Sequence, residues 1–428
     1  MGNDTSPIWY DGKQINEMLF CQEFLERQPM QYIGKSLFTV DGRISDENRL
    51  KKEILNCIEP YLKTGIAKKA ASLLDALKLK CYAQPPDLQL DRIHVANGTY
   101  FLDGTFSEEK QFCLNRLPVA YVPDAPVPDR WLTFLNELLY PEDIPTLQEF
   151  IGYCLLPTTK AQKMLFLIGK GGEGKSRVGL ILRKLFGDNM RNGSISKVET
   201  SPFARADLEH ILVMVDDDLK LEALPQTNNI KTIVTAEMPL DLERKGQQSY
   251  QGAVYSRFIA FGNGTMKSLY DRSEGFFRRQ LILTVRDRPK ERVDDPFLIE
   301  KLHEEIVGIL CWAIMGLKRL MDHQFRFTIS QRTQNNMATA VKEGNNVIDF
   351  LESEGYFRFK ADGEITSTDF YRIYMTWCHD NGLPVLSQKS FSGYLIHHEA
   401  DYNLEYHAKV QSAGGRTVRG FFGVEAIA

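Results

Sequence analysis

The chain has 428 residues, of which 43% are hydrophobic and 25% charged, and its formal net charge is −4. A chain of this length exceeds what one hydrophobic core usually organises, so we expect two or three domains. The composition is that of a soluble globular protein, and no stretch approaches the roughly 18 apolar residues that a membrane span needs. We therefore exclude a membrane protein and a membrane partner.

The cysteines indicate a reducing compartment. There are seven of them, they are scattered, and none forms a CxxC pair. An odd number without paired spacing argues against a disulfide framework and against a zinc knuckle. The first residues lack a basic segment followed by an apolar core, so they do not form a secretory signal. We expect a cytoplasmic protein.

Residues 1–125 are expected to form an accessory region of mixed α and β structure. Apolar residues at three- and four-residue spacing predict mainly helix from Gln14 to Lys80, and a pair of prolines follows at 85–86. Short apolar runs separated by Asn-Gly and Asp-Gly turn signals then predict three strands, at Arg92–Ala96, Tyr100–Asp103 and Asn115–Tyr121. Three prolines between residues 122 and 130 mark the start of the next domain.

A glycine-rich loop, GKGGEGKS, lies between a predicted strand and a predicted helix. Met164 to Ile168 is typical of a strand buried on both faces of a parallel sheet, and Lys175 to Phe186 is typical of a helix closed by Gly187. Glycines let backbone N–H groups wrap a phosphate, and the helix N-terminus adds partial positive charge. This context predicts a nucleotide-binding P-loop, against the alternative of a chance glycine turn. Its residues are Gly169, Lys170, Gly171, Gly172, Glu173, Gly174, Lys175 and Ser176.

ATP and Mg²⁺ are the expected cofactors of this loop. Lys175 would reach the β- and γ-phosphates, and the Ser176 hydroxyl would ligate Mg²⁺. The run ILVMVDDD supplies a second metal ligand at Asp216 and, at Asp217, a carboxylate that polarises the attacking water. Asp218 is a substitute for either, because the pattern leaves the register among the three aspartates open. An acidic strand end at the surface is the alternative.

Two more apolar runs carry polar residues at their ends. The strand RFIAFGN ends in Asn263, whose amide suits a role in orienting the water, although Asn-Gly is also a common turn dipeptide. Arg278 and Arg279 precede the strand Leu281 to Val285. An arginine offered by a neighbouring subunit stabilises charge that develops on the γ-phosphate, and an ordinary basic strand start is the alternative. These runs together predict an α/β sheet.

In this order, within the 111 residues from Gly169 to Arg279, the elements resemble the superfamily 3 helicases, the compact AAA+ motors of small viruses, phages and mobile elements. In particular they resemble the helicase half of the phage, plasmid and poxvirus primase-helicase family, whose pattern includes an iGY.L segment, present here in LQEFIGYCLL. The resemblance implies an α/β AAA+ P-loop NTPase core over residues 126–325 and a homo-hexameric ring.

The resemblance also implies a role for a basic segment. Between residues 225 and 290, eleven Lys or Arg residues stand against six Asp or Glu residues. In the family this stretch carries a β-hairpin that enters the pore of the ring and grips single-stranded DNA, and the match puts Arg244 and Lys245 at its tip. Adjacent cations beside a glycine turn suit phosphate contact, and a solvated tip is the alternative. No Asp-x-Asp typical of a primase lies upstream, so a separate primase or host replication protein is a candidate partner.

The tail is expected to form a winged-helix domain over residues 346–428, after a linker over 326–345. Three helices are predicted at Val347–Leu351, Asp369–His379 and Lys389–His397, followed by two strands around Gly414 and Gly415. Such a domain binds duplex DNA or docks proteins. Its candidate DNA contacts are Lys389, Ser390, Lys409, Arg416 and Arg419.

The leading hypothesis is an ATP-dependent, ring-forming DNA helicase that acts on single-stranded and forked DNA for a phage, plasmid or genomic island. The alternative is an AAA+ replication initiator or helicase loader that remodels DNA without processive unwinding. A small-molecule kinase shares only the P-loop, and it predicts neither the arginine-bearing strand nor the basic hairpin.

Overall fold

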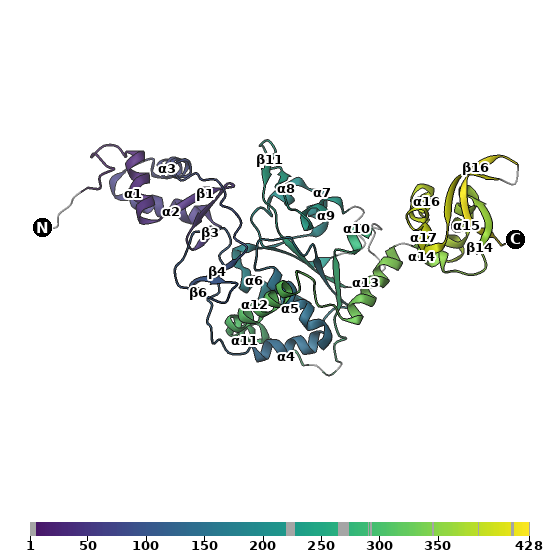
Figure 1. Cartoon of the computed structure of the whole chain (residues 1–428). Coiled ribbons are helices and arrows are strands. Elements are labelled where there is room, and N and C mark those ends of the chain that lie inside the picture. Colours follow the sequence, from purple (N-terminus) through teal and green to yellow (C-terminus); the bar gives the residue numbers. More distant parts are fainter. Residues whose placement is uncertain are drawn as a thin grey trace. The chain divides into compact units, whose positions relative to one another are not determined.

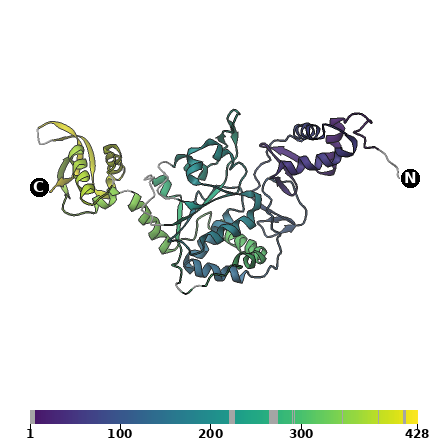
Figure 2. The ribbon, with the colours of Figure 1, turned by 180° about the vertical axis from the view of Figure 1, so that it is seen from behind.

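The computed structural model describes residues 6–219, 227–263, 274–289, 291, 293–344, 346–383, 385–411 and 415–427. The described residues form two compact units, one up to Met337 and one from Ala338 onward. Figures 1 and 2 show the chain from opposite sides. Each unit has a hydrophobic core of its own, which agrees with the expectation from chain length.

The N-terminal segment combines helices with a small antiparallel sheet, around a core that includes Trp9, Phe20 and Ile54. Its elements are α1 (Glu17–Arg27), β1 (Met30–Ile33), β2 (Ser36–Thr39), β3 (Gly42–Ile44), α2 (Glu47–Ile58), the 3-10 helix η1 (Glu59–Tyr61) and α3 (Ile66–Lys80). The expectation of mainly helical structure was wrong for the β1-β2-β3 sheet. These strands are three or four residues long, which is too short to produce a clear periodicity.

The strand-rich segment that follows α3 packs into the large hydrophobic core of the first unit. It contains β4 (Arg92–Val95), β5 (Gly98–Phe101) and β6 (Phe106–Ser107). The predicted strand at 115–121 is irregular, yet Leu117 is buried in the same large cluster as Ile93. Arg116 holds this path, because its guanidinium donates hydrogen bonds of 2.5 to 2.9 Å to four carbonyl oxygens. These belong to Val40, Val95, Gly98 and Gln111.

Five parallel strands form the centre of the first unit. Their spatial order is β13 (Gln280–Thr284), β7 (Met164–Gly169), β12 (Arg257–Asn263), β9 (Val213–Leu219) and β8 (Met190–Asn192). Leu165 of β7 pairs with Ile259 of β12, which in turn pairs with Val215 of β9. Strand β7 is buried along its whole length, as its apolar run predicts. The sheet confirms an α/β core, in which only the three-residue β8 had no counterpart in the sequence pattern.

Helices accompany the sheet in two groups (Figures 1 and 2). The first group is α4 (Asp129–Leu138), α5 (Ile144–Tyr153), α6 (Lys175–Phe186), α11 (Leu298–Glu304) and α12 (Ile306–Asp322). The second group lies beside a hairpin of β10 (Leu240–Leu242) and β11 (Tyr250–Gly252), and consists of α7 (Ile195–Thr200), α8 (Pro202–Ala206) and α9 (Asn228–Val234). The short elements are η2 (Pro141–Asp143), η3 (Gly187–Asn189) and α10 (Glu274–Phe277).

Helix α13 (Gln331–Gly344) occupies most of the predicted linker, and the division between the two units falls within it. The second unit then contains α14 (Asn346–Leu351), β14 (Phe357–Thr366), α15 (Ser367–Asp380), α16 (Gln388–His397), α17 (Glu399–Tyr402), β15 (Glu405–Gln411) and β16 (Thr417–Ala426). The three strands form an antiparallel sheet in the order β14-β16-β15. Strand β14 is mostly exposed, which is why it has no apolar signature.

Across the described ranges, no helix is both long and apolar enough to cross a membrane.

The close packing of α5 against α12 yields a first prediction. A Cβ added at Gly152 would lie 2.4 Å from the carbonyl oxygen of Ala313. Gly152→Ala is therefore expected to lower the free energy of unfolding by about 1–3 kcal/mol, measured by urea denaturation. Gly393 of α16 has open space around its Cβ position, so Gly393→Ala should raise stability by about 0.5–1 kcal/mol. Equal stability of the Gly152→Ala variant and the wild type would contradict this packing.

Candidate functional site

The loop between β7 and α6 is built by glycines in left-handed conformations. Gly171, Gly172 and Gly174 have φ values of 112°, 82° and 114°, which residues with a Cβ rarely adopt. Gly169 is restricted by space instead, because a Cβ there would lie 2.7 Å from Oε1 of Glu173. The predicted boundaries of α6 are confirmed, and Gly187 follows its last residue, whereas β7 extends one residue beyond the predicted end at Ile168.

Glu173 places its carboxylate inside this loop. Oε1 accepts hydrogen bonds from the backbone N–H groups of Lys170 at 2.5 Å and Gly171 at 2.7 Å, and Oε2 accepts one from Nζ of Lys175 at 2.7 Å. The side chains of Glu173 and Lys175 are only 4% and 6% exposed. Burial acts to raise the pKa of Glu173, but Lys175 and the backbone donors hold it below its usual value. The donors of the loop thus already surround an anion, which is the carboxylate of Glu173.

Asn263 lies beside the loop at the carboxyl edge of the sheet. It pairs in register with Gly169, and its side chain is 3.9 Å from the Cβ position of Gly171. Arg288 approaches from the segment after β13, where Nη1 is 3.9 Å from the Cβ position of Gly172. The neighbouring Asp287 pairs with Lys170 at 2.9 Å. Sequence reasoning missed Asp287 and Arg288, although their position after a parallel strand was the signal that could have found them.

The three aspartates lie within β9, which continues beyond the predicted end at Val215. Asp216 is 4% exposed, whereas Asp217 and Asp218 are exposed. The carboxylate of Asp216 accepts hydrogen bonds from the backbone N–H groups of Ile195 at 2.7 Å and Asp218 at 3.4 Å. Burial raises the pKa of Asp216 despite these donors. Strand β12 lies between β9, which carries Asp216, and β7, which leads into the glycine-rich loop.

Arg278 and Arg279 lie at the amino ends of the strands, on the opposite side of the sheet from the glycine-rich loop. They immediately precede β13, whose first residue pairs with Met164 at the start of β7. Arg279 is therefore level with Lys163, six residues before Gly169, or roughly 20 Å along the strand. Arg278 is exposed, whereas Arg279 is partly buried and donates a hydrogen bond to the carbonyl oxygen of Gly275. Neither arginine can therefore reach the loop of its own chain.

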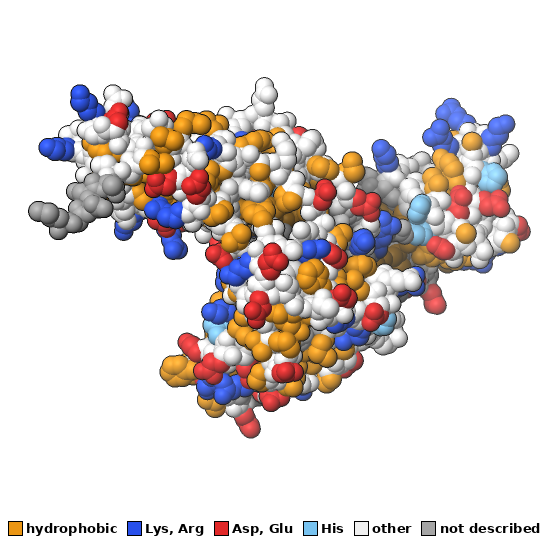
Figure 3. All heavy atoms as spheres, turned by 60° about the vertical axis from the view of Figure 1, so that its left-hand side comes forward, with side chains coloured by type: hydrophobic (Ala, Val, Ile, Leu, Met, Phe, Trp, Pro, Cys, Tyr) orange, Lys and Arg blue, Asp and Glu red, His pale blue; other side chains and the backbone are white. Residues whose placement is uncertain are grey.

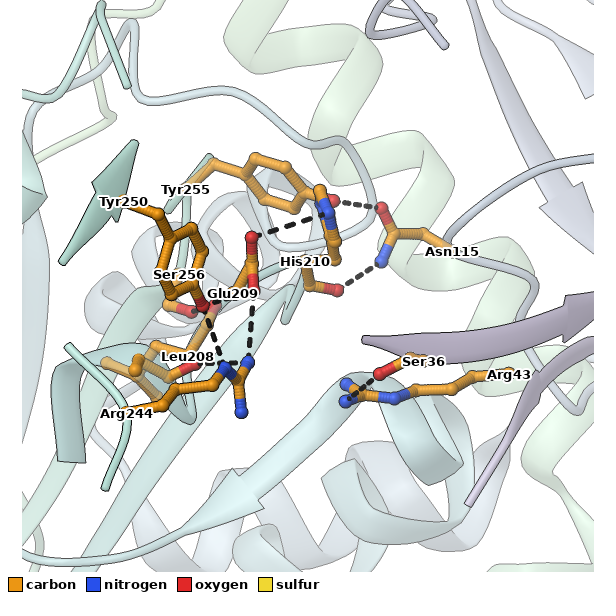
Figure 4. A network of polar contacts seen from close by, with 11 residues as sticks. Ser36, Arg43, Asn115, Leu208, Glu209, His210, Arg244, Tyr250, Tyr255 and Ser256 are labelled. Atoms are coloured by element: carbon orange, nitrogen blue, oxygen red, sulfur yellow. Dashed lines mark hydrogen bonds and ion pairs between the residues drawn. The ribbon is translucent and has the colours of Figure 1, made fainter. Parts of the chain in front are cut away.

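The hairpin predicted around Arg244 and Lys245 is present as β10 and β11. Lys245 is exposed at the tip. Arg244 folds back instead, and Figure 4 shows its guanidinium next to Glu209 and Tyr250. Nη2 lies 3.0 Å from Oε2 of Glu209, and Nε donates a hydrogen bond of 2.8 Å to the hydroxyl of Tyr250. The two adjacent cations thus have different surroundings.

Comparisons with known proteins give one family model and several structures. A family of unknown function, DUF5906, matches residues 167–279. An A-form apo structure of the NrS-1 C-terminal region (305–718) has a TM-score of 0.53 at 11% identity, with 94% of this chain and 98% of that chain covered. Another apo structure of that region has a TM-score of 0.50 at 10% identity, with coverage of 96% and 100%. No curated protein matches. At such identities, the likeness is one of fold.

The burial of Asp216 yields a second prediction. Asp216→Asn should raise the free energy of unfolding of the protein without nucleotide by about 1 kcal/mol, because an amide keeps an acceptor for Ile195 while removing a buried charge. Urea unfolding at neutral pH measures the effect. The pKa of Asp216 is raised on folding, so its ionised form destabilises the fold above the unfolded-state pKa, and the gain should shrink as the pH falls.

The matched control is Asp217→Asn, which changes an exposed carboxylate in the same strand. Its effect should stay within about 0.5 kcal/mol of zero. A loss of stability in Asp216→Asn would mean that the charge of this carboxylate is already compensated in the folded chain.

Proposed function

We propose that this chain is an ATP-dependent DNA helicase that acts as a homo-hexameric ring in the replication of a phage, plasmid or genomic island. One observation carries the proposal. The anion-binding loop and the Arg278–Arg279 pair lie at opposite edges of one parallel sheet. A phosphate in the loop of one subunit would meet these arginines only in a neighbouring subunit, which is the arrangement of an ATPase that works between subunits.

The chemistry of the loop fits ATP. Its N–H groups and Lys175 already hold a carboxylate, and the phosphates of ATP would take that place with more charge. Beside it, Asn263 would orient the attacking water and Asp217 would polarise it. The resemblance to superfamily 3 helicases supports the same roles and an AAA+ core.

Mg²⁺ fits the acidic strand. The carboxylate of Asp216 is buried among backbone donors and, within the described residues, has no cationic partner. Together with the Ser176 hydroxyl, it would hold the ion, which when bound neutralises charge on the phosphates. Asp218 stays an alternative for the role of Asp216 or of Asp217.

Mixing two inactive variants tests the sharing of the site. Lys175→Ala removes the buried cation of the loop, and Arg279→Ala or Arg278→Ala removes the cation offered to the neighbour. Each variant whose residue is essential should lose about a thousandfold or more in ATP hydrolysis. A mixture of Lys175→Ala with the inactive arginine variant should regain activity, because some interfaces combine an intact loop with an intact arginine.

The separate arginine variants also identify which of the pair acts, since Arg278 is exposed and Arg279 is partly buried. Full ATPase activity in both arginine variants would refute the shared site. So would a mixture that stays as inactive as its components.

Unwinding of a forked duplex tests the helicase activity itself. Lys175→Ala should abolish strand separation, and Lys245→Ala should slow it while leaving basal ATP hydrolysis unchanged, because Lys245 is exposed on the hairpin away from the loop. Gel-resolved strand displacement measures both. If Lys245→Ala unwinds as well as the wild type, the role of the hairpin is wrong.

The second candidate function is an AAA+ replication initiator or helicase loader. The C-terminal unit favours it, because the helices α15, α16 and α17, followed by β15 and β16, give the order expected of a winged helix. Basic side chains gather on this unit in Figure 3. Exposed ones on β15, on β16 and just before it are Lys409, Arg416 and Arg419. An initiator would hydrolyse ATP and bind duplex DNA without displacing strands from the fork.

A further inference from the structure

The base of the β10–β11 hairpin is locked to the body of the unit by Glu209. This carboxylate is 5% exposed, accepts a hydrogen bond of 2.8 Å from the hydroxyl of Tyr250, and pairs with Arg244 at 3.0 Å. Gly252 makes the approach possible, since a Cβ there would lie 2.8 Å from Oε1 of Glu209. Arg244 also donates to the carbonyl oxygen of Ala206 at 3.2 Å. Two of the three guanidinium nitrogens, Nε and Nη2, therefore hold the hairpin base to the body of the unit.

Because the charge of Arg244 is paired with that of Glu209, the hairpin tip has little net positive charge. Of the described charged residues between β10 and β11, Glu243 and Lys245 are exposed and carry opposite charges. Non-specific binding of single-stranded nucleic acid depends on several phosphate contacts. A grip by this hairpin thus requires a cation from another part of the chain.

A turn of the N-terminal sheet lies against Glu209 and the neighbouring His210. Gly34 and Lys35 join β1 to β2 between the paired residues Ile33 and Ser36. A Cβ on Gly34 would lie 3.2 Å from both Oε1 of Glu209 and Nε2 of His210. Figure 4 shows Glu209 and His210 between the hairpin residues on one side and Ser36 and Arg43 of this sheet on the other. The turn and the hairpin base are therefore neighbours.

The turn holds a residue type that its backbone disfavours. Both central residues have positive φ, 52° at Gly34 and 66° at Lys35, as in a two-residue hairpin turn of type I′. The second position strongly favours glycine, because a Cβ is strained there. Strained positions persist mainly where they serve a function. Lysine stands here at a position where glycine would fit better.

The side chain of Lys35 lies beside the hairpin and is accessible to an anion. Its Nζ lies 5.6 Å from the ring centroid of Tyr250, the first residue of β11. Lys35 is exposed, and across the described ranges neither Lys35 nor Lys245 forms an ion pair. Tyr250 thus has its hydroxyl on Glu209 and its ring beside a lysine from a distant segment.

We propose that Lys35 is a second phosphate contact for single-stranded DNA, forming one binding surface with Lys245 and Tyr250. The inference rests on the proposed function, which has the hairpin grip DNA. It assigns the N-terminal segment a part in holding the strand, with Arg244 and Glu209 as the residues that position the hairpin next to it.

Replacement by glycine separates binding from folding. Lys35→Gly removes the charge and relieves the turn, so the midpoint of thermal unfolding should be equal to or above that of the wild type. The affinity of the full chain for a fluorescein-labelled oligothymidylate, measured by anisotropy with a non-hydrolysable ATP analogue, should fall severalfold. The slope of log K against log salt should become shallower by about 0.7, the value for one lost contact to a single strand.

Three variants complete the experiment. Lys245→Ala should make the slope shallower by a similar amount, and Lys35→Arg should keep the wild-type slope. Lys52→Ala should also keep it, because Lys52 is an exposed lysine of α2 that is not part of the proposed surface. If Lys245→Ala lowers the slope and Lys35→Gly does not, the inference is overturned while the proposed function stands. If the wild type does not bind the oligonucleotide at all, the proposed function fails, and this inference fails with it.

Discussion

Parallel pairing of the five central strands is the constraint on which the arrangement of the site depends. Since all the strands run in one direction, every segment that follows a strand reaches one edge, and every segment that precedes a strand reaches the other. The glycine-rich loop and Asn263 therefore share the carboxyl edge, while Arg278 and Arg279 share the amino edge. An arginine side chain cannot bridge the roughly 20 Å between them. If these arginines act on a phosphate that is bound in such a loop, the loop must belong to a second copy of the chain.

The anion-binding loop keeps its shape through a contact within the chain. Without a partner, the N–H groups of Lys170 and Gly171 and the ammonium group of Lys175 would be partly or fully buried and unsatisfied, which costs free energy. Glu173 satisfies all three donors. A phosphate would exchange one anion for another in a preformed site. Displacing Glu173 would weaken phosphate binding, because the three donors would first have to lose the carboxylate that they hold.

Local signals were enough to predict the main elements but not the long-range contacts. Strand β7 and helix α6 were predictable because a buried apolar run, a glycine-rich loop and a terminal glycine are all local features. The surroundings of Arg244 were not, because its partner Glu209 lies 35 residues earlier and no local pattern joins the two. The β1-β2-β3 sheet was missed for a related reason, since its strands are short and their pairing is set by two tight turns.

Asp216 and Lys35 share a property that ordinary stability does not explain. Asp216 buries a carboxylate whose pKa is raised by that burial, and Lys35 holds a left-handed conformation suited to glycine. A substitution that relieves either strain is available in one step, as asparagine or glycine. Natural sequences break such local rules mainly where another requirement opposes stability. The binding of a cation at Asp216 and of a phosphate at Lys35, as proposed above, would make each unfavourable residue the better choice.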